Sequence, residues 1–470
     1  MNRRDILNTA ACGAASLALH GCTGPAQKTT PPAAEKPNII FIIVDDMGWA
    51  DLPCYGGKSI QTPNIDRMAA DGIRFTNAYS GCTVCAPARS VLMTGLHMGH
   101  TPVRGNTGGI PIRDHDVTVA EVLKHAGYVT GGFGKWGLGD VRTPGVPEKQ
   151  GFDTFFGYYH QVHAHYYWPD YLWSNSETIP VLGEKGSAEG YTHYRIFAEM
   201  LHFIRTNKDR PFFCYAPWTP PHGRYEIPES DPAWKIYKDK PWPQMAKVVA
   251  AMVSMIDRHV GRLLELLSEL DIDRRTIVFF CSDNGAAARF EGTLDSSGPL
   301  RGFKRSMYEG GIRVPFIARW PGCIPKGAVS DLPCYFADMM PTLAEIAAAT
   351  QYVPDNIDGL SILPTLIANP NEQKKHRFMY WEWQLYNWGK KQNIPNRLMQ
   401  AVRMGKWKAV RHRSNLPFEL YDLSSDIGEE NDLAADHPEI VRKIEAYIKR
   451  TRTEPPPQIE PPKPQGKRYR

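Results

Sequence analysis

Short apolar runs alternate along this chain with longer stretches in which apolar residues recur every three or four positions. The runs at 38–44, 211–216, 276–281 and 314–318 predict buried parallel strands. The periodic stretch over 245–270 predicts a long amphipathic helix. Strands and helices that alternate in this way predict an α/β fold, with a large, mostly parallel sheet flanked by helices.

Local start and stop signals predict further helices. A short capped helix is expected from Asn64, and Thr118-Val-Ala-Glu121 forms a capping box whose helix would end at Gly127. Pro87 suits the first turn of a helix, so Cys85 is expected at a helix N-terminus, where free N–H groups favour an anion. A structural role is the alternative for a cysteine in this place.

The pattern changes after about residue 366. Three short alternating runs at 378–383, 400–403 and 407–410 predict an antiparallel sheet, and 438–451 predicts a helix. The expected organisation is an export signal (1–22), a linker (23–36), a main domain (37–366), a C-terminal subdomain (367–453) and a Pro-rich tail (454–470).

The N-terminus has the order of an export signal: charged, then apolar, then small. The pair Arg3-Arg4 resembles a bacterial twin-arginine signal, and the apolar stretch to Leu19 is too short to span a bilayer. Cys22 follows in a setting that resembles a lipoprotein cleavage site, although His20 is unusual there. We expect export to the periplasm or surface of a bacterium, and whether a lipid on Cys22 anchors the chain to the membrane stays open.

Composition limits the classes of partner. The 470 residues carry a net charge of only +5, spread evenly, which argues against nucleic acid. Seven of the nine cysteines lie beyond the signal without the density of a disulfide framework, although some could pair after export. The spacing of Cys82 and Cys85 suits a redox or zinc pair, but no second pair matches it.

Two predicted strands end in hard oxygen donors. Asp45 and Asp46 follow the first run, and Asp283 and Asn284 follow the third. In parallel sheets ligands bind beyond the carboxyl ends of strands, and such donors suit Ca²⁺ or Mg²⁺ rather than a soft metal. Either pair alone would be better explained as a cap of a strand-end turn. Two pairs together favour a metal site.

The segment Cys85-Ala-Pro-Ala-Arg89, followed by Thr94-Gly95, resembles the signature of formylglycine-dependent sulfatases, the arylsulfatase-like branch of the alkaline phosphatase superfamily. The resemblance extends in the family's order over roughly 37–345. Its further blocks are 37–49, 62–66, 134–136, 282–285, Lys304 and 308–315.

The resemblance implies that a maturation enzyme oxidises Cys85 to formylglycine, whose hydrate attacks sulfur. It implies one divalent ion, Ca²⁺ rather than Mg²⁺, and positive side chains that neutralise the sulfate. His222 would protonate the leaving alcohol with help from Lys304. The implied metal ligands are Asp45, Asp46, Cys85, Asp283 and Asn284, and the implied cations are Arg89, Lys135 and Lys304.

The sequence departs from the family at Gly137, where many relatives carry a histidine that acts late in the reaction. We hypothesise that His163 or His165 supplies the missing imidazole, because alternate residues of an extended segment point to the same side. Substrate binding, or no role at all, is the alternative for both.

The block 158–173 is dense in aromatic residues and histidine. It resembles relatives that act on sulfated glycans, although it could equally pack beneath a loop. The predicted substrate is a sulfated carbohydrate of the galactose or N-acetylgalactosamine type. Two rivals remain: a phosphonate or phosphodiester hydrolase of the same superfamily, and a surface glycan-binding protein whose Cys85 is never converted.

Overall fold

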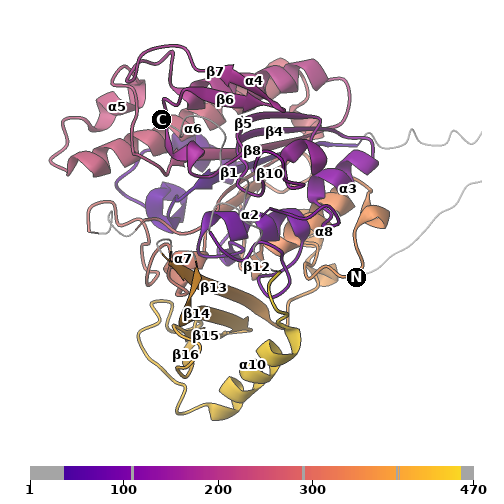
Figure 1. Cartoon of the computed structure of the whole chain (residues 1–470), viewed down its shortest axis with the longest axis vertical. Coiled ribbons are helices and arrows are strands. Elements are labelled where there is room, and N and C mark those ends of the chain that lie inside the picture. Colours follow the sequence, from indigo (N-terminus) through magenta and orange to yellow (C-terminus); the bar gives the residue numbers. More distant parts are fainter. Residues whose placement is uncertain (1–35, 107–110, 288–291, 388–389, 391, 457–470) are drawn as a thin grey trace, which may run out of the picture. The chain divides into compact units, whose positions relative to one another are not determined.

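The computed structural model describes residues 36–106, 111–287, 292–387, 390 and 392–456 (Figure 1). The described residues lie within one compact unit. The predicted export signal, the lipoprotein site at Cys22, all of the linker except Lys36, and the tail beyond residue 456 lie outside them. Within these ranges no helix is both long and apolar enough to cross a bilayer.

A ten-stranded mixed sheet forms the centre of the fold. Its central strand pairs β1–β8, β1–β9, β4–β8 and β4–β5 are parallel, as predicted. Its order is β11 (Ala328–Ser330), β2 (Ile73–Phe75), β10 (Phe316–Arg319), β9 (Thr276–Ser282), β1 (Asn38–Asp45), β8 (Phe212–Pro221), β4 (Val129–Lys135), β5 (Thr154–Tyr158), β6 (Tyr171–Ser174) and β7 (Glu177–Pro180).

The strand predicted at 314–318 exists as β10, but its predicted direction is wrong. It pairs antiparallel with both β9 and β2. The run is apolar because both faces of the strand are covered, and a buried antiparallel strand needs the same composition as a parallel one. Antiparallel pairs also extend the opposite edge, where β5, β6 and β7 follow one another.

Helices cover both faces of this sheet. Alternate residues of β1 enter two separate apolar cores, Phe41 on one side and Ile42 on the other. The first core packs against α2 (Cys85–Thr94), α3 (Val119–His125) and α8 (Met339–Ile346). The second packs against α1 (Pro63–Ala70), α4 (Thr192–Asn207) and α6 (Gln244–Glu269). Shorter helices are α5 (Pro232–Tyr237), α7 (Glu309–Ile312) and α9 (Leu363–Leu366).

The predicted helix signals are confirmed. Thr118 accepts a hydrogen bond from the Glu121 backbone N–H, and the Glu121 carboxylate accepts one from the N–H of Thr118. Helix α2 begins at Cys85 and ends at Thr94. Gly95 caps it, with a φ of 67° in the left-handed region that glycine adopts without strain.

The predicted C-terminal sheet and helix are also present. Four antiparallel strands run in the order β13 (Met379–Asn387), β14 (Gln392–Met404), β15 (Trp407–Arg411) and β16 (Glu419–Asp422), with α10 (Pro438–Thr451) after them (Figure 1). A two-stranded sheet joins β3 (Ala78–Tyr79) to β12 (Cys334–Tyr335). The Trp381 indole donates to the Ser80 carbonyl oxygen at 2.8 Å, so the C-terminal sheet is tied to the main domain close to α2.

All seven cysteines beyond the predicted signal are described, and they form no disulfide with one another. Cys82 is buried, and its thiol contacts the Glu382 carbonyl oxygen. Its pairing with Cys85 through a disulfide is therefore not seen.

Candidate active site

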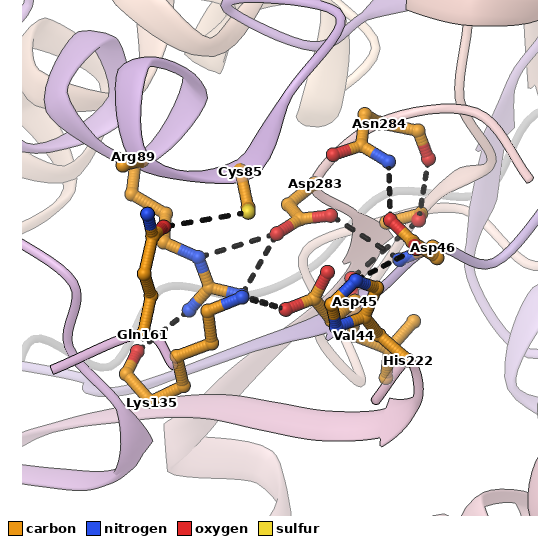
Figure 2. A network of polar contacts seen from close by, with 12 residues as sticks. Val44, Asp45, Asp46, Cys85, Arg89, Lys135, Gln161, His222, Asp283 and Asn284 are labelled. Atoms are coloured by element: carbon orange, nitrogen blue, oxygen red, sulfur yellow. Dashed lines mark hydrogen bonds and ion pairs between the residues drawn. The ribbon is translucent and has the colours of Figure 1, made fainter. Parts of the chain in front are cut away.

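The polar residues that follow β1 and β9 lie side by side. The two strands are parallel neighbours, and Val44 and Ser282 are their last paired residues. The chain turns directly afterwards: Asp46 has a φ of 66°, a left-handed conformation that aspartate tolerates better than most residues. All four predicted oxygen donors are thereby gathered and buried: Asp45, Asp46, Asp283 and Asn284 (Figure 2).

The N-terminus of α2 delivers Cys85 to this cluster. The Cys85 sulfur, one Asp45 oxygen and one Asp283 oxygen all lie within 4.8 Å of one another. One turn later, Arg89 donates to Asp283 Oδ2 at 2.8 Å and to the Lys135 carbonyl oxygen at 2.6 Å. The predicted proximity of the signature cysteine and the acidic strand ends is therefore observed.

Three further predicted residues reach the same carboxylates. Lys135, the last residue of β4, forms an ion pair with Asp45, and Lys304 forms one with Asp46. His222 follows β8, and its Nε2 lies 3.4 Å from Asp46 Oδ2. The residues come from several strand ends and loops, as expected for a site at the carboxyl edge of a parallel sheet.

Two buried oxygen atoms indicate that this cluster fits a cation. Asp45 Oδ1 and Asn284 Oδ1 accept no hydrogen bond from any part of the chain that the structure describes. The Asn284 amide nitrogen donates to Asp46 Oδ1 at 2.7 Å, so its oxygen is the atom left available. A buried acceptor without a partner costs about 1–3 kcal/mol, and a hard divalent cation would satisfy both atoms. The donor set therefore fits a divalent metal.

The acidities of the carboxyl groups agree with this interpretation. Burial raises the pKa of Asp46 and, with the charge of Asp45, raises that of Asp283 to about 7. Burial also acts to raise the pKa of Asp45, but Lys135 and other cations outweigh it and hold that pKa well below its usual value. Buried carboxylates that repel one another in this way would be stabilised by a cation between them.

Two amide side chains that the sequence did not single out as site residues lie next to Cys85. Asn106 Oδ1 and Gln161 Oε1 each lie 3.7 Å from the Cys85 sulfur, and the Gln161 amide donates to the Asn106 carbonyl oxygen at 3.3 Å. A β-carbon added to Gly137 would lie 3.8 Å from that of Gln161. Gln161 thus lies beside Gly137, where the family resemblance leads us to expect a histidine. No motif distinguishes either amide residue.

The two candidate histidines are separated by the fold. The prediction of an extended segment is wrong, because 163–165 forms a 3-10 turn that sends the two side chains in different directions. His163 is buried between the rings of Tyr158 and Tyr171, where burial lowers its pKa to about 3. His165 packs against His222, with 4.4 Å between the ring centroids. Only His165 lies beside a predicted catalytic residue.

The aromatic block is partly core and partly surface. Tyr158, Tyr159 and Tyr167 are buried, whereas Tyr166 and Trp168 are partly exposed. Packing therefore accounts for some of its rings, and the others remain accessible.

Comparisons with known proteins agree with this site. Residues 37–349 match the family model described as Sulfatase, and 302–454 match the one described as N-sulphoglucosamine sulphohydrolase, C-terminal. Human N-acetylgalactosamine-6-sulfatase is 35% identical over 371 residues, which are 71% of this chain and 66% of that protein. This chain thus spans about two thirds of that relative's length.

A bacterial relative and a solved structure match more completely. The N-acetylgalactosamine-6-O-sulfatase of Bacteroides thetaiotaomicron is 28% identical, and the match covers 93% of this chain and 97% of that protein. The structure of Ps i-CgsB in complex with k-i-k-neocarrahexaose superposes with a TM-score of 0.76 at 28% identity, over 88% of this chain and 93% of that one. This chain therefore belongs to the sulfatase family of sulfuric ester hydrolases, within the alkaline phosphatase superfamily.

Proposed function

We propose that this chain releases sulfate from sulfated carbohydrates of the galactose or N-acetylgalactosamine type, and that its Cys85 is converted to formylglycine. The observation that carries the proposal is the Cys85 sulfur at a helix N-terminus beside two buried carboxylates. The names of the human and Bacteroides relatives, both N-acetylgalactosamine sulfatases, support the choice of sugar.

The chain's own charges suit a sulfate ester. Formylglycine hydrate would supply the oxygen nucleophile, and a divalent ion, which we propose is Ca²⁺, would supply positive charge at the sulfate. Asp45, Asp46, Asp283 and Asn284 would hold that ion. Arg89, Lys135 and Lys304 offset the three carboxylates, so with the ion the site is net positive and attracts an anion.

His222 is the proposed proton donor to the leaving alcohol. Its side chain is 17% exposed, whereas those of Asp45, Arg89 and Lys135 are fully buried. The site therefore opens to solvent on the side of His222, where the sugar would have to lie. An alkoxide leaves poorly, so a proton delivered at this point lowers the barrier. His165, packed against His222, is the proposed source of a second imidazole.

The cellular setting is proposed from the sequence. Export through the twin-arginine-like signal would bring the protein to the periplasm or cell surface, and a lipid on Cys22 would anchor it there. A formylglycine-generating enzyme would be needed as its maturation partner.

A paired assay tests the function. Protein from a host that carries out the maturation is given N-acetylgalactosamine 6-sulfate and galactose 6-sulfate, and the matched phosphate esters. We expect sulfate release that the Cys85→Ala variant loses. Faster release of phosphate would favour a phosphoester hydrolase, and tight sugar binding without release of either anion would favour a glycan-binding protein.

A further inference from the structure

The loop that carries His222 is clamped to the turn that carries His165. The Arg224 backbone N–H donates to the His165 carbonyl oxygen at 3.2 Å, and the Tyr167 hydroxyl donates to the His222 carbonyl oxygen. Gly223 permits this close approach, because its φ is 105° and a β-carbon there would lie 3.0 Å from the His165 carbonyl oxygen. The two segments are therefore joined along one edge of the catalytic site.

The same edge carries an arginine on an aromatic platform. The Arg224 guanidinium carbon lies 4.1 Å from the centroid of the Tyr166 ring. Arg224 is exposed, and within the described ranges no carboxylate forms an ion pair with it. A guanidinium held over a ring can still donate its N–H groups to a ligand, which suits a carboxylate or sulfate.

A groove leads away from this arginine. A cavity of about 370 Å³ is lined by Tyr166, Trp168 and Arg224, among others. A second cavity of about 480 Å³ shares Trp168 with the first and extends to Trp234 at the start of α5. Both volumes lie within the range of roughly 300–1,000 Å³ that is typical of small-ligand sites.

The floor of the groove is held in place. The Trp168 indole donates to the Ser187 carbonyl oxygen at 2.9 Å, and its ring packs 5.0 Å from that of Tyr191. Lys185 and Glu226, which line both cavities, neutralise each other in an ion pair of 2.8 Å. In the first cavity, Arg224 is thus the charged side chain that remains available to select a ligand. Trp168 lines both cavities and offers an aromatic face between them.

We propose that this groove binds the sugars next to the sulfated residue, and that Arg224 recognises a negative charge on the first of them. The inference rests on the proposed function and deepens it: the preferred substrate is an oligosaccharide with adjacent anionic residues, not a single sulfated sugar. A carboxylate of a uronic acid and a second sulfate share the required chemistry.

The test compares four probes in wild type and the Arg224→Gln variant. The probes are N-acetylgalactosamine 6-sulfate alone and the same sugar linked to galactose, to glucuronate or to galactose 6-sulfate. We expect Arg224→Gln to lower the kcat/KM ratio of the two disaccharides that carry a second negative charge over the monosaccharide by about 10-fold or more, since hydrogen bonds to charged groups are the strong ones. The glucuronate and sulfate probes identify which anion is preferred.

Arg377→Gln is the matched control, because Arg377 is also exposed and lies over an aromatic ring, that of Phe378. It should leave the ratio unchanged. An equal loss on all four probes, or none, would overturn the proposal. Failure of the proposed function and failure of the groove are distinguished by measuring how the probes bind to the inactive Cys85→Ala variant. If wild type releases no sulfate, the proposed function fails. The effect of Arg224→Gln on the dissociation constants, measured in the Cys85→Ala background, still tests the groove.

Discussion

The imidazole of His165 lies across that of His222, with ring centroids 4.4 Å apart and an interplanar angle of 64°. His163, only two residues earlier, is enclosed by tyrosine rings. We predict that His165→Phe, which keeps the packing, lowers kcat by about 10²-fold or more, the loss typical of an acid–base group. His163→Phe should lower the melting temperature and leave kcat within about twofold. Steady-state kinetics on one sulfated sugar decide this, and equal kcat values for the two variants would argue against a role for His165.

The role of His222 predicts a dependence on the leaving group. His222→Gln removes the proton donor beside Asp46, so kcat for a sugar sulfate should fall by about 10²–10⁴-fold. With 4-nitrophenyl sulfate the loss should be far smaller, because nitrophenolate leaves without a proton. The same loss with both substrates would mean that His222 acts on binding or on the metal instead.

Asp45 Oδ1 and Asn284 Oδ1 accept no hydrogen bond from the described residues, which predicts that a bound metal stabilises the fold. Asn284→Ala should lose most of the rise in melting temperature that CaCl₂ gives to EDTA-treated wild type, a rise worth about 2.7 kcal/mol at 100 times Kd. Asn207→Ala removes another buried asparagine, one that bonds the Phe203 carbonyl within α4, and should keep the calcium response. A full response in Asn284→Ala would remove this residue from the ligand set.

A buried ion pair joins the C-terminal sheet to the main domain. Lys408 donates to Glu309 at 2.7 Å, and both side chains are fully buried. Lys408→Met leaves the buried Glu309 with Arg313 at 3.2 Å but without its lysine, and should cost up to about 3–5 kcal/mol in the free energy of unfolding, measured by urea denaturation. Adding Glu309→Gln should recover part of this loss. A cost below about 1 kcal/mol for the single variant would show that the interface tolerates the charge.

Glu429 lies beside the same pair and predicts a pH dependence. Burial, with the charge of Glu309, raises its pKa to about 7. Between about pH 4.5 and 7 the folded state therefore holds a proton that the unfolded state has lost, so this group's contribution to stability falls as pH rises. In Glu429→Gln, the midpoint of urea denaturation should change less with pH over this window than it does in wild type. An unchanged slope would show that Glu429 is ionised throughout.

The sequence predicted those elements whose residue pattern fits only one kind of secondary structure. The run at 38–44 is apolar at nearly every position, and it forms the central strand β1, which is buried on both faces. The capping box at Thr118 and the helix that begins at Cys85 were equally specific. The site followed from these elements, since neighbouring parallel strands bring their ends together.

Other parts depend on contacts that are distant in sequence. Strand β4, which delivers Lys135, has three glycines and a weak strand signal; Gly134 is required there because a β-carbon would lie 2.1 Å from the Pro217 carbonyl oxygen. The placement of Asn106 and Gln161 beside Cys85 arises from loop packing. The direction of β10 depends on how the chain returns to the sheet.

The central claim concerns the side chain at position 85. The most direct measurement is the mass of the peptide containing Cys85, taken from protein that releases sulfate. Oxidation of a thiol-bearing side chain to an aldehyde lowers the mass by about 18 Da, and we predict this species, with activity proportional to its abundance. A fully unmodified thiol in protein that still releases sulfate would contradict the account.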